Sequence, residues 1–142
     1  MRPTKGEFSN GISAYQQCGI RTEIESASAH KLIQMLLDGA LTKTRIARRC
    51  IEHRDIVGKC ENIDWSMEII GGLRGSLNLQ SGGVIAENLD TLYEYMCRQL
   101  ALANVRNDVG LLDEVLSLLG EIKAGWDGIE SLISHGPVAV AL

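Results

Sequence analysis

The side chains best suited to chemistry lie in the first half of the chain, around His53. Cys50, His53 and Cys60 could supply three metal ligands or a pair of redox thiols, because thiolate sulfur and imidazole nitrogen are donors that zinc prefers. Two residues that cap a helix end, together with a buried thiol, explain the same spacing equally well. A metal- or redox-active helical bundle is therefore kept as an alternative, and no cofactor is expected.

The sequence lacks the patterns that would identify an enzyme. Its histidines include no pair at the i, i+4 spacing of a helical metal site, and no HExxH stretch occurs. The glycine pairs at 71–72 and 82–83 are not followed by the Lys-Ser/Thr of a phosphate loop. No GxSxG element or Cys/His catalytic signature is present. We therefore expect no catalytic activity.

One basic cluster offers a second chemistry, the binding of phosphate backbones. It consists of Lys43, Arg45, Arg48 and Arg49, followed by Arg54. A basic-face nucleic-acid adaptor built on these arginines is a further alternative. The cluster has no interleaved aromatic residues, however, and the second half of the chain is acidic within a total net charge of −4. A solvated helix face is the simpler interpretation, and we expect no nucleic-acid partner.

The composition indicates what kind of scaffold positions these side chains. Of the 142 residues, 45% are hydrophobic and only 4% are aromatic, and leucine and alanine dominate over the β-branched residues typical of sheets. No apolar run is long enough to span a bilayer, and residues 1–10 contain no apolar signal core. Four scattered cysteines without an export signal predict reduced thiols. We therefore expect an all-α protein in the cytoplasm, without stable membrane insertion.

Hydrophobic periodicity predicts four long helices. Apolar residues recur at steps of three and four over about 28–56, 59–79, 84–105 and 112–133, with turn signals between the segments. Because short loops force consecutive helices to fold back on one another, the prediction is an antiparallel up-down four-helix bundle. The expected division is an N-terminal flexible segment or cap over 1–25, formed as a short helix or flap, the bundle over 26–135, and a flexible tail over 136–142.

Glycine is unusually frequent inside these predicted helices. Each interior glycine costs on the order of 1 kcal/mol relative to alanine. Close approach between helices would explain this cost, and a loosely packed bundle is the other explanation; we favour the first. The positions are Gly39, Gly71, Gly72, Gly75, Gly120, Gly125 and Gly128.

Several stretches in order resemble the flagellar secretion chaperone family FliS. They are residues 25–40, residues 69–77 with their Leu-Arg-Gly-Ser-Leu element, and residues 82–96, followed by Ala103-Asn104 and by Trp126 in the last helix. Two positions depart from the family pattern. Ala29 stands where the family has proline, which weakens only the helix start. Leu37 stands where the family usually has tyrosine, so a contact made by that hydroxyl is in doubt.

The resemblance implies a partner and a task. A member of this family is a cytoplasmic export chaperone that binds the disordered C-terminal region of newly made flagellin. Binding prevents premature polymerisation and keeps the subunit ready for delivery to the flagellar export apparatus. Contact with the membrane export gate is implied as well.

The candidate partner-binding residues follow from apolar surface in excess of a bundle core. The first helix carries a second apolar stripe beside its core stripe, and two nearby tyrosines point in different directions from the third helix. Tyr15 would hold an N-terminal flap over a groove until flagellin displaces it. The predicted partner-binding residues are Tyr15, Ile33, Leu37, Leu41, Tyr93 and Tyr95. The predicted core residues are Leu32, Leu36, Leu89, Leu92, Met96, Leu119 and Trp126.

Overall fold

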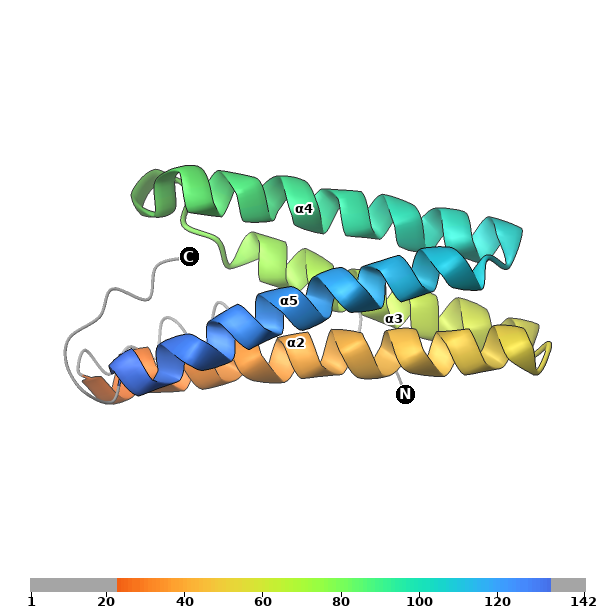
Figure 1. The fold of residues 1–142 in the computed structure, drawn as a ribbon, viewed down its shortest axis with the longest axis horizontal. Coiled ribbons are helices and arrows are strands. Elements are labelled where there is room, and N and C mark those ends of the chain that lie inside the picture. The colour runs from red at the N-terminus through yellow and green to blue at the C-terminus, as the bar shows by residue number, and fades with distance from the viewer. Residues whose placement is uncertain (1–22, 134–142) are drawn as a thin grey trace.

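The computed structural model describes residues 23–133, which form four helices and confirm the all-α prediction (Figure 1). Their bounds are α2 (Glu23–Glu52), α3 (Ile56–Gly75), α4 (Leu79–Arg106) and α5 (Val109–Ile133). Consecutive helices run in opposite directions, so the described residues form an up-down bundle. Tyr15, most of the predicted N-terminal segment and the predicted tail lie outside the described residues.

The helices pack in a cycle in which each touches its two neighbours. α2 contacts α3 and α5, and α4 contacts the same two helices from the other side. The contact between α2 and α3 is the most extensive and that between α4 and α5 the least. Of the predicted core residues, Leu36, Met96, Leu119 and Trp126 are buried, while Leu32, Leu89 and Leu92 are half-buried against the core. The core is therefore continuous but thinner between α4 and α5.

A buried polar contact fixes how α2 and α3 lie against each other. The hydroxyls of Thr44 and Ser66 are 2.8 Å apart, and Thr44 also donates to the carbonyl oxygen of Ala40 at 2.8 Å. Both side chains are fully buried, so each would lose a needed partner if the helices slid past one another. Gly39 faces Ile69 in the same antiparallel register.

The turn between α2 and α3 differs from the predicted one. The predicted helices over 28–56 and 59–79 place this turn at Val57-Gly58, but α2 ends at Glu52 and Gly58 already belongs to α3. The Asp55 carboxylate accepts a hydrogen bond from the Gly58 amide at 3.0 Å and so caps the start of α3. Arg54 makes the reversal with a left-handed φ of 58°. The N-cap aspartate therefore starts α3 before Gly58, and this glycine does not end a helix.

Glycine explains the shape of the start of α4. Gly83 has φ 57° and ψ −135°, which breaks the helical path four residues after Leu79. Residues with a Cβ rarely adopt this conformation, whereas glycine does so readily. A stop and turn predicted at residues 80–83 is therefore misplaced, because α3 already ends at Gly75 and residues 79–106 form α4; Gly83 marks a kink inside α4, and the regular part of α4 begins after it.

The preferred explanation for the interior glycines is wrong at five of the seven positions. A Cβ added at these positions would meet no atom within 4 Å. They are Gly71, Gly75, Gly120, Gly125 and Gly128. Gly39 matches close approach, because its Cβ would lie 3.3 Å from Ile69 Cδ1. Gly72 is buried. Most interior glycines thus lower helix stability without allowing closer packing.

Alanine at the open glycine positions is expected to stabilise the protein. Gly120→Ala and Gly125→Ala should each raise the free energy of unfolding by about 0.5–1 kcal/mol, because the helix gains propensity and the methyl group meets nothing. Urea denaturation followed by circular dichroism measures the change. Gly58→Ala is the matched control: its methyl group would lie 2.9 Å from Cys50 Sγ, so this variant should be destabilised. Loss of stability in Gly120→Ala would contradict the open environment.

Candidate partner-binding surface

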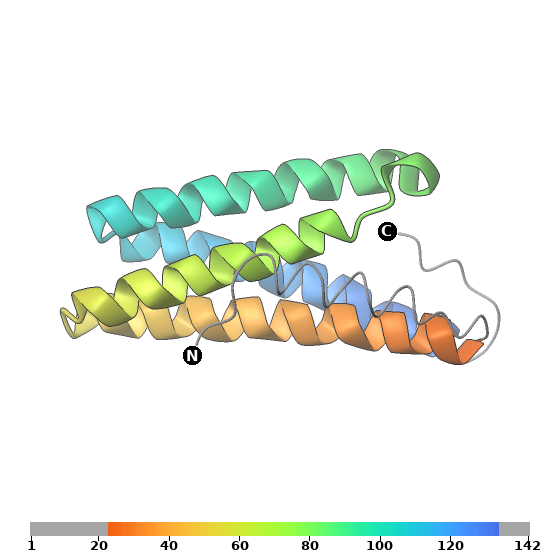
Figure 2. The same cartoon turned by 180° about the vertical axis from the view of Figure 1, so that it is seen from behind.

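The two ends of the bundle differ in how well their helices are joined. At one end, which we name the closed end, the α2–α3 turn lies beside the α4–α5 turn, and Lys59 Nζ donates to Asn107 Oδ1 at 2.7 Å. At the other, the open end, α3 stops at Gly75 and α4 begins at Leu79. There α4 stands away from α2 and from the last turns of α5 in both views (Figures 1 and 2).

Burial along one stripe of α4 follows this divergence. Apolar residues recur at steps of three and four on this side of the helix. Met96, Leu100 and Ala103 are fully buried toward the closed end, and Leu89 and Leu92 are half-buried in the middle. Ile85, on the same stripe near the open end, is 60% exposed. The stripe therefore leaves the core as α4 leaves its neighbours, and we name Ile85, Leu89 and Leu92 the α4 apolar face.

Further exposed apolar side chains lie close to this face in the chain. Leu79 and Val84 flank the Gly83 kink and are exposed. On α2, Met35 is 61% exposed. On the same side of the helix, Lys31 and Asp38 lie one turn away and Thr42 lies two turns away, and all three are exposed. These polar neighbours on the same side of the helix are the sequence feature that predicts a surface position for Met35.

The predicted partner-binding residues divide into buried and accessible ones. Leu37, Leu41 and Tyr93 are buried in the core, so they reach a partner only if helices separate. Ile33 is half-buried. In the antiparallel register that places Gly39 opposite Ile69, Ile33 lies opposite Gly75, the last residue of α3.

Tyr95 is half-buried and joins α4 to α5. Its hydroxyl donates to Glu114 Oε1 at 2.6 Å, and the Arg98 guanidinium lies 5.9 Å from its ring centre. The hydrogen bond to the carboxylate, more than burial, raises the pKa of Tyr95 above its ordinary value. The ring is therefore held in place and partly accessible, with its polar end already engaged.

Tyr93 makes the stability of the fold sensitive to high pH. Burial raises the pKa of Tyr93 to about 12, because the phenolate cannot be solvated in the core. The unfolded chain titrates near its ordinary pKa of about 10. Stability from this group is thus fully present below pH 10 and is lost as the pH rises toward 12.

We expect the free energy of unfolding to fall by about 2–3 kcal/mol between pH 10 and 12 because of Tyr93 alone. Urea denaturation at several pH values measures the fall. Tyr93→Phe isolates it, since this variant keeps the ring and removes the titrating hydroxyl, and should lose stability less steeply over the same range. Identical pH profiles for the two proteins would contradict the burial of an ionisable Tyr93.

Cys50, His53 and Cys60, which would form the alternative metal or redox site, do not share a common partner in the part of the chain that the structure describes. Cys50 Sγ donates to Asp55, Cys60 Sγ donates to Asn104 Oδ1 at 3.4 Å, and His53 is exposed. Within residues 23–133, no group of three His, Cys, Asp or Glu side chains is arranged to hold a metal ion.

The basic cluster of the nucleic-acid alternative is partly neutralised. Arg48 Nε lies 2.7 Å from Asp113 Oδ1, and its Nη1 lies 3.2 Å from Glu52 Oε2. These contacts raise the pKa of the Arg48 guanidinium, with the hydrogen bond to Asp113 as the largest cause. Arg45 and Arg49 remain exposed. The helix face therefore carries less free positive charge than the sequence indicated.

None of the helices in the described part of the chain is both long enough and apolar enough to cross a membrane.

Comparison with known proteins identifies one family. A model of the family described as flagellar protein FliS matches residues 11–132. Flagellar secretion chaperone FliSB of Pseudomonas aeruginosa is 48% identical over 118 residues, which cover 83% of this chain and 94% of the relative. Flagellar secretion chaperone FliS of Salmonella typhimurium is 43% identical over 121 residues, covering 84% and 90%. The corresponding Bacillus subtilis protein is 33% identical over 117 residues, covering 82% and 84%.

Proposed function

This chain belongs to the FliS family and is a flagellar secretion chaperone, not an enzyme; we propose that it binds the C-terminal region of flagellin in the cytoplasm. Binding would keep flagellin from polymerising prematurely and hold it ready for the export apparatus. Contact with the export gate at the membrane is part of the same proposal.

The observation that supports this proposal best is the α4 apolar face. Ile85, Leu89 and Leu92 follow one another at steps of four and three, and their exposure increases toward the open end. An amphipathic helix of a partner binds to such a surface by placing its own i, i+3, i+4 and i+7 residues against it. Exposed Leu79 and Val84 would extend the apolar area around the Gly83 kink. A helix-forming segment of flagellin is the partner that this surface suits.

Ile33 and Tyr95 would add contacts from outside this face. Ile33 is half-buried near the end of α3, and the ring of Tyr95 is half-buried beside α5. Tyrosine suits an interface because it offers broad apolar area at little entropic cost. Leu37, Leu41 and Tyr93 would support the site from the core by fixing the helices that carry it. Tyr15, which lies outside the described residues, would anchor the N-terminal segment until flagellin displaces it.

Capture of the segment would explain inhibition of polymerisation. An apolar helix face that lies on the chaperone is no longer available to pair with another flagellin subunit. The segment would pay the entropy of ordering when it binds, so the affinity would depend on how much apolar area is buried.

Isothermal titration calorimetry with the full chain and a C-terminal flagellin fragment tests the proposal. We expect saturable binding with a negative heat-capacity change, and a gain of helix in the fragment by circular dichroism. The melting temperature of the chaperone should rise with fragment concentration, because the fragment binds only the folded state. An N-terminal flagellin fragment serves as the control. Absence of both heat and a melting shift at micromolar concentrations would contradict the proposal.

A further inference from the structure

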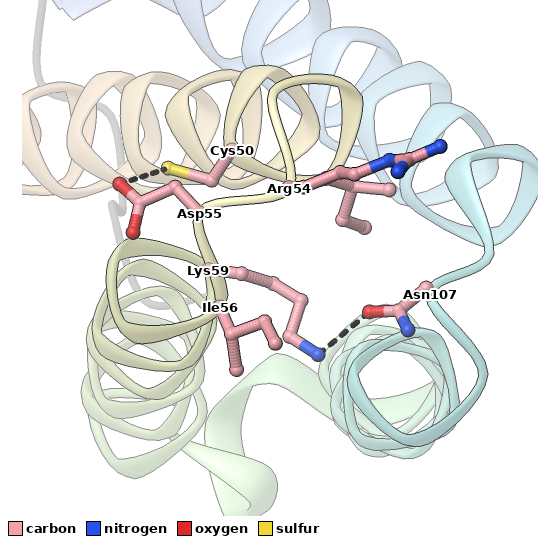
Figure 3. Close-up of a pocket in the computed structure, with 7 residues that line it drawn as sticks. Cys50, Arg54, Asp55, Ile56, Lys59 and Asn107 are labelled. Carbon is pink, nitrogen blue, oxygen red and sulfur yellow. Dashed lines mark hydrogen bonds between the residues drawn. The ribbon is translucent and has the colours of Figure 1, made fainter.

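A pocket of about 370 Å³ lies at the closed end of the bundle (Figure 3). It lies between the end of α2, the start of α3 and Asn107 in the α4–α5 turn. The volume is within the range of roughly 300–1,000 Å³ typical of ligand sites. None of the residues assigned to flagellin binding lines it.

Lys59 carries a buried positive charge into this pocket. Its side chain is only 6% exposed, and its Nζ donates to the carbonyl oxygen of Asn104 at 2.9 Å and to Asn107 Oδ1 at 2.7 Å. Both acceptors are neutral, and an ammonium group has three donors. Among the described residues, no carboxylate lies within ion-pair distance of Lys59. The backbone dipoles at the end of α4 offset this charge in part, but no counter-charge does.

Within residues 23–133, the second charge at the pocket also has no acidic side chain within ion-pair distance. Arg54 lies at the rim, exposed, and its backbone is held in the α2–α3 turn by the hydrogen bond of its amide to Ile51. Asp55 lines the same pocket, but its carboxylate accepts from the Gly58 amide and from Cys50 Sγ. In Figure 3 this carboxylate points away from both Arg54 and the Lys59 ammonium. An anion that enters the pocket would therefore meet two cations, while the Asp55 carboxylate is turned away and already hydrogen-bonded.

Apolar side chains surround these charges. Ile51 and Ile56 line the pocket, and Ile56 is exposed. Val57 and Val105, in the adjoining turns of α3 and α4, are exposed as well, Val105 to 82%. Around the closed end, residues 43–59 and 104–113 contain seven basic and four acidic residues, although the whole chain is acidic. Charge and shape together suit a carboxylate that is attached to an aliphatic body.

We propose that this pocket binds an acidic side chain of a partner polypeptide, with its carboxylate between Arg54 and Lys59 and neighbouring aliphatic residues on Ile56, Val57 and Val105. The lysine donor is already oriented by Asn104 and Asn107, so little entropy is lost when it forms one more hydrogen bond. The site is separate from the α4 apolar face. It goes beyond the proposed function, because it gives the chaperone a docking point that flagellin at the open end would leave free.

The test is an NMR titration of the full-length, ¹⁵N-labelled protein with acetyl-leucyl-glutamyl-leucine amide. We expect saturable shifts of the amide signals of residues 51–59 and Asn107. The glutaminyl peptide of the same sequence should bind about tenfold more weakly, because a hydrogen bond to a charged group is lost. Arg54→Gln should weaken binding of the glutamyl peptide by a similar factor. Arg45→Gln, which removes an exposed basic residue of α2 outside the pocket, should leave the affinity unchanged.

Replacing the buried Lys59, for example by methionine, could unfold the protein. Arg54 is exposed, so Arg54→Gln should keep the fold, and its affinity for the glutamyl peptide tests the proposal in either case. Equal affinities for the glutamyl and glutaminyl peptides, or shifts that avoid the pocket, would overturn the proposal. A titration with a short single-stranded oligo(dT) tests whether the closed end binds any polyanion. If the oligonucleotide binds more tightly than the peptide and Arg45→Gln weakens it as much as Arg54→Gln does, the closed end is a general polyanion surface and the proposal fails.

Discussion

Trp126→Ala is expected to lower the free energy of unfolding by about 3–5 kcal/mol. The indole is only 7% exposed and stacks on the His30 ring with 4.6 Å between ring centres and 10° between planes. Its Nε1 donates to the carbonyl oxygen of His30 at 3.0 Å. Together with Gln34, which donates to Asp127 at 2.7 Å, this side chain therefore joins the last turns of α5 to the beginning of α2.

Urea denaturation of Trp126→Ala and Trp126→Phe separates the two contributions. The phenylalanine variant keeps an aromatic ring beside His30 and loses the indole donor, so it should cost less than the alanine variant. Trp65 supplies the matched control, because it is half-buried with the Lys43 ammonium 3.9 Å from its ring centre. Trp65→Ala should be clearly less destabilising than Trp126→Ala. Equal losses for the two tryptophans would contradict the central position of Trp126.

The fold was predictable because every helix repeats its apolar residues over several turns. Such a pattern is strong evidence for a helix, and short turns leave an up-down arrangement as the simplest solution. The helix ends were harder to predict. At the α2–α3 turn, a glycine that could end one helix stands three residues after an aspartate that could begin the next, and the left-handed conformation of Arg54 carries no signal in its residue type.

Which apolar residues are accessible could not be predicted from periodicity. Ile85 and Met96 lie on one stripe of α4, and the pattern assigns both to the core. One is largely exposed and the other fully buried, because Ile85 follows the Gly83 kink near the open end, where α4 stands away from α2, and Met96 lies further toward the closed end. Leu37 and Leu41 show the reverse case, since these residues of the second apolar stripe of α2 are buried in the core. Coverage depends on where a neighbouring helix ends or diverges.

The pocket at the closed end was not predictable for a similar reason. Lys59 and Arg54 each have the residue type of a solvated surface position, and the basic cluster around them indicated a charged helix face. The pocket arises only when the α4–α5 turn brings Asn107 against Lys59, a contact between residues 48 positions apart. Tertiary packing therefore turns an ordinary lysine into a buried cation.

Two charges placed at the open end should abolish most of the affinity for flagellin. We expect Val84→Asp combined with Ile85→Asp to weaken binding of the C-terminal fragment by about 100-fold, because apolar contacts are replaced by carboxylates that the bound helix would desolvate. Both side chains are exposed in the free protein, so the melting temperature should stay close to that of the unsubstituted chain. Isothermal titration calorimetry gives the affinities.

Val105→Asp is the matched control, since Val105 is also a highly exposed valine on α4 but lies near the closed end. It should bind the fragment with unchanged affinity. Leu37→Ala gives the complementary result: its side chain is fully buried, so it should lower the stability of the chaperone while the folded variant still binds. If the double aspartate variant bound as tightly as Val105→Asp, the α4 apolar face would not be the flagellin site. If the double aspartate variant loses affinity without losing stability, and Leu37→Ala loses stability without losing affinity, binding and folding depend on different residues. The exposed end of the α4 stripe would then serve binding, and the buried residues would serve folding.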